Sequence, residues 1–291
     1  MQGCPPSGSI VDCYPGEIAV DLVSLKILLL CVLIFVPLER VLALRPTQKI
    51  FRKGIVNDAI YAISNGPLVN LVGGVLFVPA ISAAMLLVPA SVAQAVSGQA
   101  TWLQVIEIIV LTDLGVYAAH RAFHAVPALW RFHSIHHGVE EMDWLAAFHS
   151  HPVDQIITKT VSLLPVFLLG FSTEAFAIYS IVYLGHGVLI HANVRMSFGP
   201  LKYVIASPQF HHWHHANERI AYDKNFAGQL AIIDAIFGTF QVPPGAETPV
   251  KYGVDDPIPA NYFGQIGYPF LPRKAEIETD QPHALKPDGG V

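Results

Sequence analysis

The sequence predicts an all-α fold: an integral membrane helical bundle of four or more transmembrane helices, with a cytosolic helical cap that holds a histidine-rich di-metal site. Composition is the first reason, because 53% of the 291 residues are hydrophobic and only 13% are charged, about half the charge of a typical soluble domain. Long apolar blocks are the second reason. The third is that 13 of the 14 histidines lie between positions 120 and 215. This composition argues against a soluble enzyme and a disordered chain, and the net charge of −5 offers no basic surface for nucleic acid.

The first expected membrane helix covers residues 18–38, an apolar stretch long enough to cross a bilayer. A basic loop, 39–54, follows it, and no further Lys or Arg occurs before Arg121. The positive-inside rule therefore places this loop in the cytoplasm and the uncharged loop 89–101 on the other side.

Three more apolar blocks follow, at 59–88, 102–120 and 156–192. The block 59–88 contains Asn, Gly and Pro, and it is either one kinked helix or a shallow hairpin that would invert the orientation of the rest. With one helix, the block 102–120 returns inward and brings His120 to the cytoplasmic face. The block 156–192 is interrupted near Gly170, which predicts a helical hairpin that leaves and re-enters the cytoplasmic side.

These blocks divide the chain into three segments. Residues 1–104 are expected to contain the N-terminal membrane helices and the basic cytosolic loop. Residues 105–242 are expected to form the histidine-box catalytic domain, including the membrane hairpin at 156–192. Residues 243–291 are polar and Pro-rich and are expected to be an irregular C-terminal tail.

The histidines occur in boxes with helical spacing. His120 and His124 are four residues apart and lie on one face of a helix. Two further boxes repeat an i, i+3, i+4 pattern that lets three imidazoles converge, and their members are His133, His136, His137, His211, His214 and His215. Imidazole nitrogen suits iron, zinc, copper and nickel. Eight boxed histidines are about twice what one tetrahedral ion needs, so the boxes predict two metal ions in a shared site.

Other histidines are weaker candidate ligands. His186 and His191 are five residues apart, roughly 140° around a helix, so they share a face only where the helix ends or kinks. His151 precedes a proline and is expected to be extended, which permits a ligand role without requiring one. No role is predicted for the remaining three, which are His149, His212 and His283.

The combined boxes and their flanks resemble the fatty acid hydroxylase / sterol desaturase superfamily. The segment 141–152, which ends in His-Pro, is similar to the family's stretch after the second box, and 223–226 and 234–239 are similar to the stretch after the third. The resemblance covers about 105–242. It implies a multi-pass membrane enzyme with a histidine-ligated di-iron centre on the cytoplasmic face, acting on lipid C–H bonds with O2. The family's further ligands would correspond to His186 and His191.

The resemblance implies a hydroxylase that oxidises a fatty acyl, sterol or related lipid. A desaturase or an ether-lipid monooxygenase on the same scaffold is the alternative, because box spacing does not separate these reactions. The chain has no dinucleotide-binding or haem-attachment motif, so electrons are expected from a separate reductase or carrier protein. A membrane metal transporter is a remote alternative, since transport sites lie near the bilayer midplane rather than at helix ends.

Acidic residues near the boxes are candidates to orient the ligand imidazoles, with solvated loop acids as the alternative. These acids are Glu140, Glu141, Asp143 and Asp154. Asp113 lies seven residues before His120 on the same helical stripe, about 10 Å deeper in the membrane. An ionisable residue at that depth is a candidate functional residue. We therefore expect Asp113 to face the substrate channel or to hydrogen-bond a ligand histidine.

Overall fold

The computed structural model describes residues 20–272 apart from 74, 76, 77, 246 and 247. The described residues form helices and contain no β-strand, only two isolated bridges that pair Ala43 with Val194 and Ala216 with Tyr252. The predicted all-helical fold is confirmed for this part of the chain.

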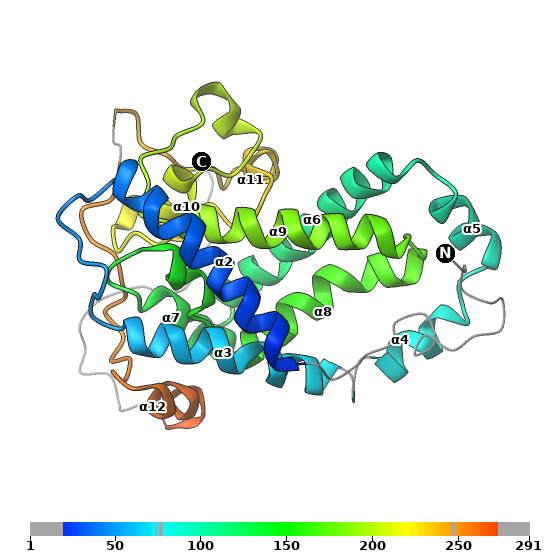
Figure 1. Ribbon diagram of the computed structural model, residues 1–291, viewed down its shortest axis with the longest axis horizontal. Coiled ribbons are helices and arrows are strands. Elements are labelled where there is room, and N and C mark those ends of the chain that lie inside the picture. The colour runs from blue at the N-terminus through cyan, green and yellow to red at the C-terminus, as the bar shows by residue number, and fades with distance from the viewer. Residues whose placement is uncertain (1–19, 74, 76–77, 246–247, 273–291) are drawn as a thin grey trace, which may run out of the picture.

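Five long helices carry the architecture: α2 (Val20–Val41), α3 (Ile55–Val72), α6 (Thr101–Ala125), α8 (Pro152–Leu169) and α9 (Thr173–His191). The short α-helices are α4 (Val78–Met85), α5 (Ala90–Ser97), α7 (Pro127–His137), α10 (Pro208–His214), α11 (Ala231–Phe237) and α12 (Tyr262–Gly267). Short 3₁₀ helices are η2 (Trp144–Phe148), η3 (Gly199–Tyr203), η4 (Arg219–Ala221) and η5 (Tyr268–Phe270). In Figure 1, α7 and α10 lie at one end of α8 and α9, and α5 lies beyond the other end.

Helices α6, α8 and α9 are long and apolar enough to cross a membrane, with mean hydropathies of 1.5, 1.3 and 1.4. They pack together through α6, which contacts both α8 and α9. At Gly115 the α6 backbone comes so close to α8 that an added Cβ would lie 2.5 Å from Ser162 Cα. This close approach brings together a small apolar core of Ile108, Val166, Phe171, Ala175 and Tyr179.

The ends of these helices follow from the local sequence. Helix α6 stops at Val126, which is extended because Pro127 follows it and disfavours a helical conformation at the preceding residue. Helix α8 ends at Gly170, whose φ of 74° is the left-handed conformation typical of a helix C-terminus. Ser172 then begins α9 by accepting a hydrogen bond from the Ala175 N–H at 3.3 Å. The break expected near Gly170 is therefore the turn between two helices.

The structure adds detail to two expectations. The block 59–88 is divided between two helices, α3 and α4, and the junction between them includes residues outside the described part of the chain. The C-terminal segment is less irregular than expected, because residues 262–270 form α12 and η5. This segment packs on α7, where Trp130 Nε1 donates to Asp256 at 3.0 Å and Arg131 donates to the Tyr268 carbonyl at 2.7 Å.

Candidate metal centre

Nine predicted histidines converge from four helices. The C-terminal half of α6 supplies two, the last two turns of α7 supply three, the last residue of α9 supplies one, and the end of α10 supplies three. Helix α10 is only seven residues long, and its start is fixed by Ser207, whose hydroxyl accepts from the Phe210 N–H at 3.1 Å. Short helices with defined starts therefore set the direction of the ligand side chains.

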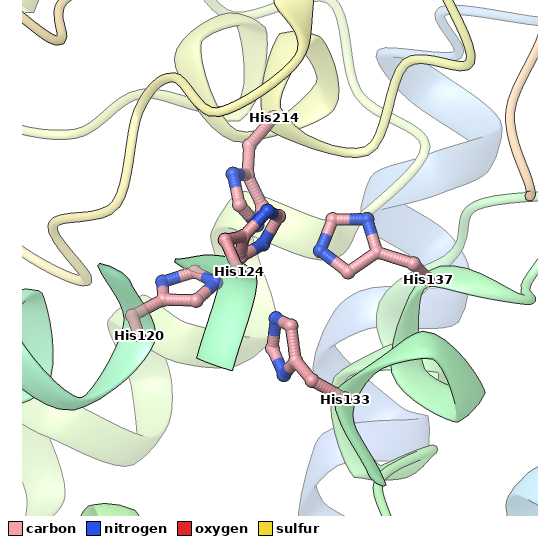
Figure 2. Close-up of side chains that lie close together, drawn as sticks. All are labelled: His120, His124, His133, His137 and His214. Atoms are coloured by element: carbon pink, nitrogen blue, oxygen red, sulfur yellow. The ribbon is translucent and has the colours of Figure 1, made fainter. Parts of the chain in front are cut away.

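The nine side chains form two groups in which the candidate ligand atoms lie within 4.8 Å of one another. The five-histidine group, drawn in Figure 2 with its rings facing a common centre, consists of His120, His124, His133, His137 and His214. The four-histidine group consists of His136, His191, His211 and His215.

Sequence neighbours belong to different groups. His136 and His137 separate on α7, and His214 and His215 separate at the end of α10. Consecutive helical residues point about 100° apart, so each short helix lies between the two groups and serves both. The rings of His137 and His215 stack across the boundary with centroids 4.6 Å apart. The two groups are therefore halves of one centre.

In the five-histidine group, four of the Nδ1 atoms face oxygen atoms. His120 Nδ1 donates to the Phe226 carbonyl at 2.7 Å, and His214 Nδ1 donates to the Lys224 carbonyl at 2.7 Å. Asp154 Oδ2 accepts from His133 Nδ1 at 2.6 Å, and Asp223 Oδ1 lies 3.3 Å from His124 Nδ1. These contacts fix the tautomer that leaves the Nε2 lone pair directed into the centre.

The four-histidine group shows the same arrangement at two positions. His136 Nδ1 donates to the His149 carbonyl at 2.9 Å, and His191 Nδ1 donates to the Gly187 carbonyl at 2.7 Å. Their Nε2 atoms lie 3.3 Å apart, and His211 Nε2 is 2.9 Å from that of His191. A neutral imidazole with its proton on Nδ1 has only an acceptor at Nε2, so the His136 and His191 lone pairs face each other without a proton between them.

This donor set fits a metal ion. With metal–nitrogen bonds of about 2.0–2.1 Å, neighbouring ligand nitrogens lie roughly 2.9–3.4 Å apart, which matches the distances in the four-histidine group. In the five-histidine group, buried Nε2 atoms have no hydrogen-bond partner at His120, His133, His137 and His214. Buried polar atoms are rarely left unpartnered, so these lone pairs point to an ion in the five-histidine group.

Burial keeps the imidazoles in the ligand-competent state. It lowers the pKa of His136 to about 3, and it lowers the pKa values of His137 and His215 well below the ordinary value, with neighbouring imidazoles adding to the effect. These side chains are therefore neutral near pH 7. A metal can bind them without displacing a proton from Nε2.

Two predicted ligands lie outside both groups. His186 Nε2 donates to the Ala206 carbonyl at 2.8 Å. His151 begins α8, where its Nδ1 accepts from the Val153 N–H at 3.1 Å and its Nε2 donates to the Ile266 carbonyl at 3.2 Å. Helix α9 runs without a break through both His186 and His191, so the two side chains diverge, as their spacing requires.

The two undecided histidines inside the boxed region have supporting contacts. His212 donates or accepts at both nitrogens, with the Tyr252 hydroxyl at 2.7 Å and the Ala192 carbonyl at 3.0 Å. His149 bonds through Nδ1 to Asp58, and its backbone carbonyl is the acceptor for His136.

An ionic network behind His149 was not predicted from the sequence. The buried Arg52 guanidinium donates to Asp58 at 2.5 Å and to both oxygens of Asp143 at 2.6 Å. Asp143 also caps η2 by accepting from the Leu145 N–H at 3.0 Å. Asp58 lies 91 residues before His149, and no spacing signal connects them.

The expected acidic residues divide by what they contact. Asp154 hydrogen-bonds the ligand His133 directly. Asp143 bonds Arg52, which in turn bonds Asp58, the partner of His149. Glu140 pairs with the exposed Lys53 side chain at 3.0 Å, and Glu141 accepts from the Lys53 N–H at 3.2 Å. These two glutamates fit the alternative of solvated loop acids.

Asp113 has a different partner from the one expected. Its carboxylate accepts three backbone N–H bonds, from Gly228 at 2.8 Å, Gln229 at 3.0 Å and Leu230 at 2.6 Å. None of these three bonds involves a histidine. Both oxygens are already used by this loop, so Asp113 anchors residues 228–230 to α6.

Comparisons with known proteins agree with this geometry. The chain is 31% identical over 183 residues to an ornithine lipid hydroxylase, OlsE, from Rhizobium tropici, covering 62% of this chain and 55% of the relative. It is 34% identical over 158 residues to alkylglycerol monooxygenase from Homo sapiens, covering 54% and 34%. It is 29% identical over 143 residues to the very-long-chain aldehyde decarbonylase GL1-1 from Oryza sativa subsp. indica, covering 45% and 22%.

The chain thus spans about half the length of the first relative and a third of the second. No solved structure matches it. The model of the fatty acid hydroxylase family matches residues 105–239, which include all nine converging histidines. This segment is therefore similar to the fatty acid hydroxylase family.

Proposed function

We propose that the chain is a membrane-bound di-iron oxygenase that hydroxylates a C–H bond of a lipid, using O2 and electrons from a separate reductase or carrier. The observation that carries the proposal is the pair of adjoining groups in which nine imidazoles each offer a ligand atom, with the ligand atoms of a group within 4.8 Å of one another. The family match and the lipid-oxidising relatives support lipid oxidation over metal transport.

The nine histidines of the two groups are the proposed metal ligands. His186 and His151 are not included, because both lie outside the two groups, where His186 bonds a backbone carbonyl through Nε2 and His151 bonds backbone groups through both ring nitrogens. When bound, the two iron ions would supply the reductive activation of O2 needed to oxidise a C–H bond.

The protein side chains provide placement and exclusion of water. Asp154 and the carbonyls of Phe226, Lys224 and His149 hold the ligand rings in one tautomer. Most ligand side chains are buried, so bulk water is kept from the centre. The centre lies at one end of α6 and α9, where the acyl part of a lipid can approach along the apolar helices.

The membrane arrangement is also a proposal. We infer that α2 and the apolar block 59–88 cross the bilayer together with α6, α8 and α9, and that the histidine centre lies on the cytoplasmic face. The basic residues at the end of α2 and in the loop after it support this orientation, and they are Arg40, Arg45, Lys49, Arg52 and Lys53. In this arrangement residues 1–104 form the N-terminal membrane part, 105–242 the catalytic part and 243–291 a C-terminal segment packed on the cap.

A second candidate reaction is oxidation of an ether lipid. Alkylglycerol monooxygenases from four animals are among the relatives, at 26–34% identity. Hydroxylation beside an ether oxygen gives an unstable hemiacetal that releases an aldehyde. The two reactions therefore use the same oxidation step and differ in the carbon that is attacked.

The test is metal analysis and turnover of the purified chain in lipid. Two irons per chain and an O2-dependent lipid product heavier by one oxygen atom are expected, with release of a fatty aldehyde marking the ether-lipid reaction. Lipidomics of a strain that lacks the gene would identify the substrate by the missing oxygenated lipid. The variant His137→Ala serves as the inactive control, and a single zinc with no O2-dependent turnover would overturn the proposal.

A further inference from the structure

We propose that η3 and α11 form a surface that inserts into the acyl region of the bilayer leaflet beside the cap. The η3–α11 surface is defined as residues 199–205 and 231–237. The inference rests on α6 crossing the bilayer, which belongs to the proposed function, and it adds a membrane contact made by residues outside the long helices.

The segment 226–239 descends along α6, as three successive contacts show. The Phe226 carbonyl accepts from His120 Nδ1, near the end of α6. Lower on the helix, the Tyr117 hydroxyl lies 3.1 Å from Thr239 Oγ1. Lower still, Asp113 binds the N–H groups of residues 228–230. Since Asp113 is seven residues from His120, this loop lies about 10 Å deeper along α6 than the histidines.

The backbone N–H groups of residues 226–230 are satisfied inside the protein, as membrane depth requires. Asp113 accepts three N–H groups of the loop, and Asp234 accepts those of Phe226 and Ala227, each at 2.8 Å. Asp234 also accepts from the Thr239 hydroxyl at 2.6 Å, which closes the segment on itself. Gly228 packs against α6 so closely that an added Cβ would lie 3.2 Å from Asp113 Oδ1. The backbone here needs little from water.

The outward side of the η3–α11 surface is apolar. The exposed large side chains of this surface are Leu201, Tyr203, Val204, Ile205, Ile232, Ile236 and Phe237. The two parts are joined by backbone bonds from Ala206 N–H to the Gln229 carbonyl at 2.8 Å and from Ile232 N–H to the Val204 carbonyl at 3.4 Å. The charged residues of the surface are Lys202 and the fully buried Asp234. A contiguous apolar surface of this kind marks an interaction site.

Lipid is the occupant that fits this surface, because its depth along α6 coincides with the apolar part of a candidate membrane span. The half-buried Lys202 lies beside the Tyr203 ring, with Nζ 5.4 Å from the ring centroid. Lysine and tyrosine side chains at an interface keep their apolar parts in the lipid and their polar ends near the headgroups. The pair thus places the η3 end of the surface at the headgroup level.

Insertion of this surface would set the depth of the metal centre. Phe237 at its edge stacks on Tyr117 with centroids 5.1 Å apart, and Tyr117 contacts Phe226 at 5.8 Å. Phe226 in turn packs on His120 and His124 at 5.5 and 5.1 Å. A packed aromatic row therefore connects the membrane-facing surface to the five-histidine group.

The test is a nitroxide spin label at single cysteines in the iron-loaded full chain, reconstituted in nanodiscs of phosphatidylcholine and phosphatidylglycerol. The three native cysteines are replaced, Cys31 by alanine because it is buried in an apolar core. Ile236→Cys reports on the surface at a side chain that is 72% exposed, and Ile181→Cys reports on α9 at one that is 74% exposed. Val250→Cys is the matched control, 88% exposed on the cap and hydrogen-bonded through its backbone to Glu218.

Power saturation compares the access of lipid-soluble O2 with that of water-soluble chromium oxalate. We expect the ratio of O2 access to chromium oxalate access at residue 236 to match the ratio at 181 and to exceed the ratio at 250. A ratio at 236 equal to that at 250, with 181 still in lipid, overturns the insertion and leaves the proposed membrane spans intact. Low access of both reagents at 236 also overturns it, because a protein contact then covers the surface. An aqueous ratio at 181 overturns both proposals.

Discussion

The two histidine groups share helices α7 and α10 but are supported differently. Two of the five Nδ1 atoms in the five-histidine group face carboxylates, Asp154 and Asp223, and two others face backbone carbonyls. In the four-histidine group, two Nδ1 atoms face backbone carbonyls, and those of His211 and His215 are buried without a hydrogen-bond partner.

Charge is therefore distributed unequally. An all-imidazole centre provides no ligand charge to neutralise its ions, so nearby carboxylates matter. The five-histidine group has direct carboxylate contacts, while the four-histidine group is reached by Asp58 only through His149. We expect the first group to hold its ion more tightly and the second to lose its ion first.

Loss of one ligand from each group is expected to have the largest effect. His137→Ala and His136→Ala change neighbouring residues that belong to different groups. Each variant should lose one of the two ions and lower turnover at least about 100-fold, since changes behind a ligand alone cost 10–100-fold. Metal content by mass spectrometry and iron Mössbauer spectra check this, because each variant should retain a different iron signal.

The control for this pair is His186→Gln, which can still donate to the Ala206 carbonyl. It should keep both ions. If it loses one, His186 is a ligand after all, as its place in the resemblance implies. If either alanine variant loses both ions, the two groups do not bind independently.

Asp154→Asn is expected to have the next largest effect. The carboxylate is buried and accepts the His133 Nδ1–H at 2.6 Å, so a neutral amide weakens the charge support of the five-histidine group. Metal affinity there should fall about 10–100-fold. Chelator titration followed by Mössbauer spectroscopy should show the order of metal loss reversed relative to the native chain. Glu140→Gln, an exposed acid paired with Lys53, is the matched control and should leave the order unchanged.

Much of the difference between the two histidine groups could not be predicted from the sequence. Box spacing predicted the helical faces of eight of the nine converging histidines, the resemblance implied the ninth, His191, and the interruption near Gly170 predicted the turn between α8 and α9. Box spacing could not predict that His136 and His137 would separate, because that depends on where α7 lies between α6, α9 and α10. Spacing within one helix contains no information about the packing of its neighbours.

The contacts that acidic residues make with residues distant in the sequence could not be predicted either. Asp113 was identified as important by its depth, but its partners at 228–230 lie 115 or more residues away. Arg52 belongs to the basic loop 39–54, whose composition indicated only membrane orientation, and Asp58 lies in the first turn of α3. Their pairing behind His149 depends on α3 packing against η2, a tertiary contact that no local pattern encodes.

Asp58→Asn tests the indirect support of the four-histidine group. The change removes a buried charge that bonds both Arg52 and His149, and the free energy of unfolding should fall by about 1.5–3 kcal/mol. Its effect on metal affinity should be below the roughly tenfold expected for a direct contact, because it acts through the His149 backbone. Thermal unfolding of metal-free and metal-loaded protein separates the two effects. A larger loss of metal affinity than in Asp154→Asn would contradict the expectation that indirect support is weaker than a direct carboxylate contact.

Asp223→Asn is expected to have the smallest effect, although this acid also faces a ligand. Its side chain is 51% exposed and lies 3.3 Å from His124 Nδ1, so water screens the charge. Its φ of 56° is left-handed, a conformation that asparagine tolerates as well as aspartate. The substitution therefore removes the charge without disturbing the backbone. Metal affinity of the five-histidine group should change less than about tenfold, measured by the same chelator titration. A loss equal to that of Asp154→Asn would mean that burial does not decide which carboxylate supports the ion.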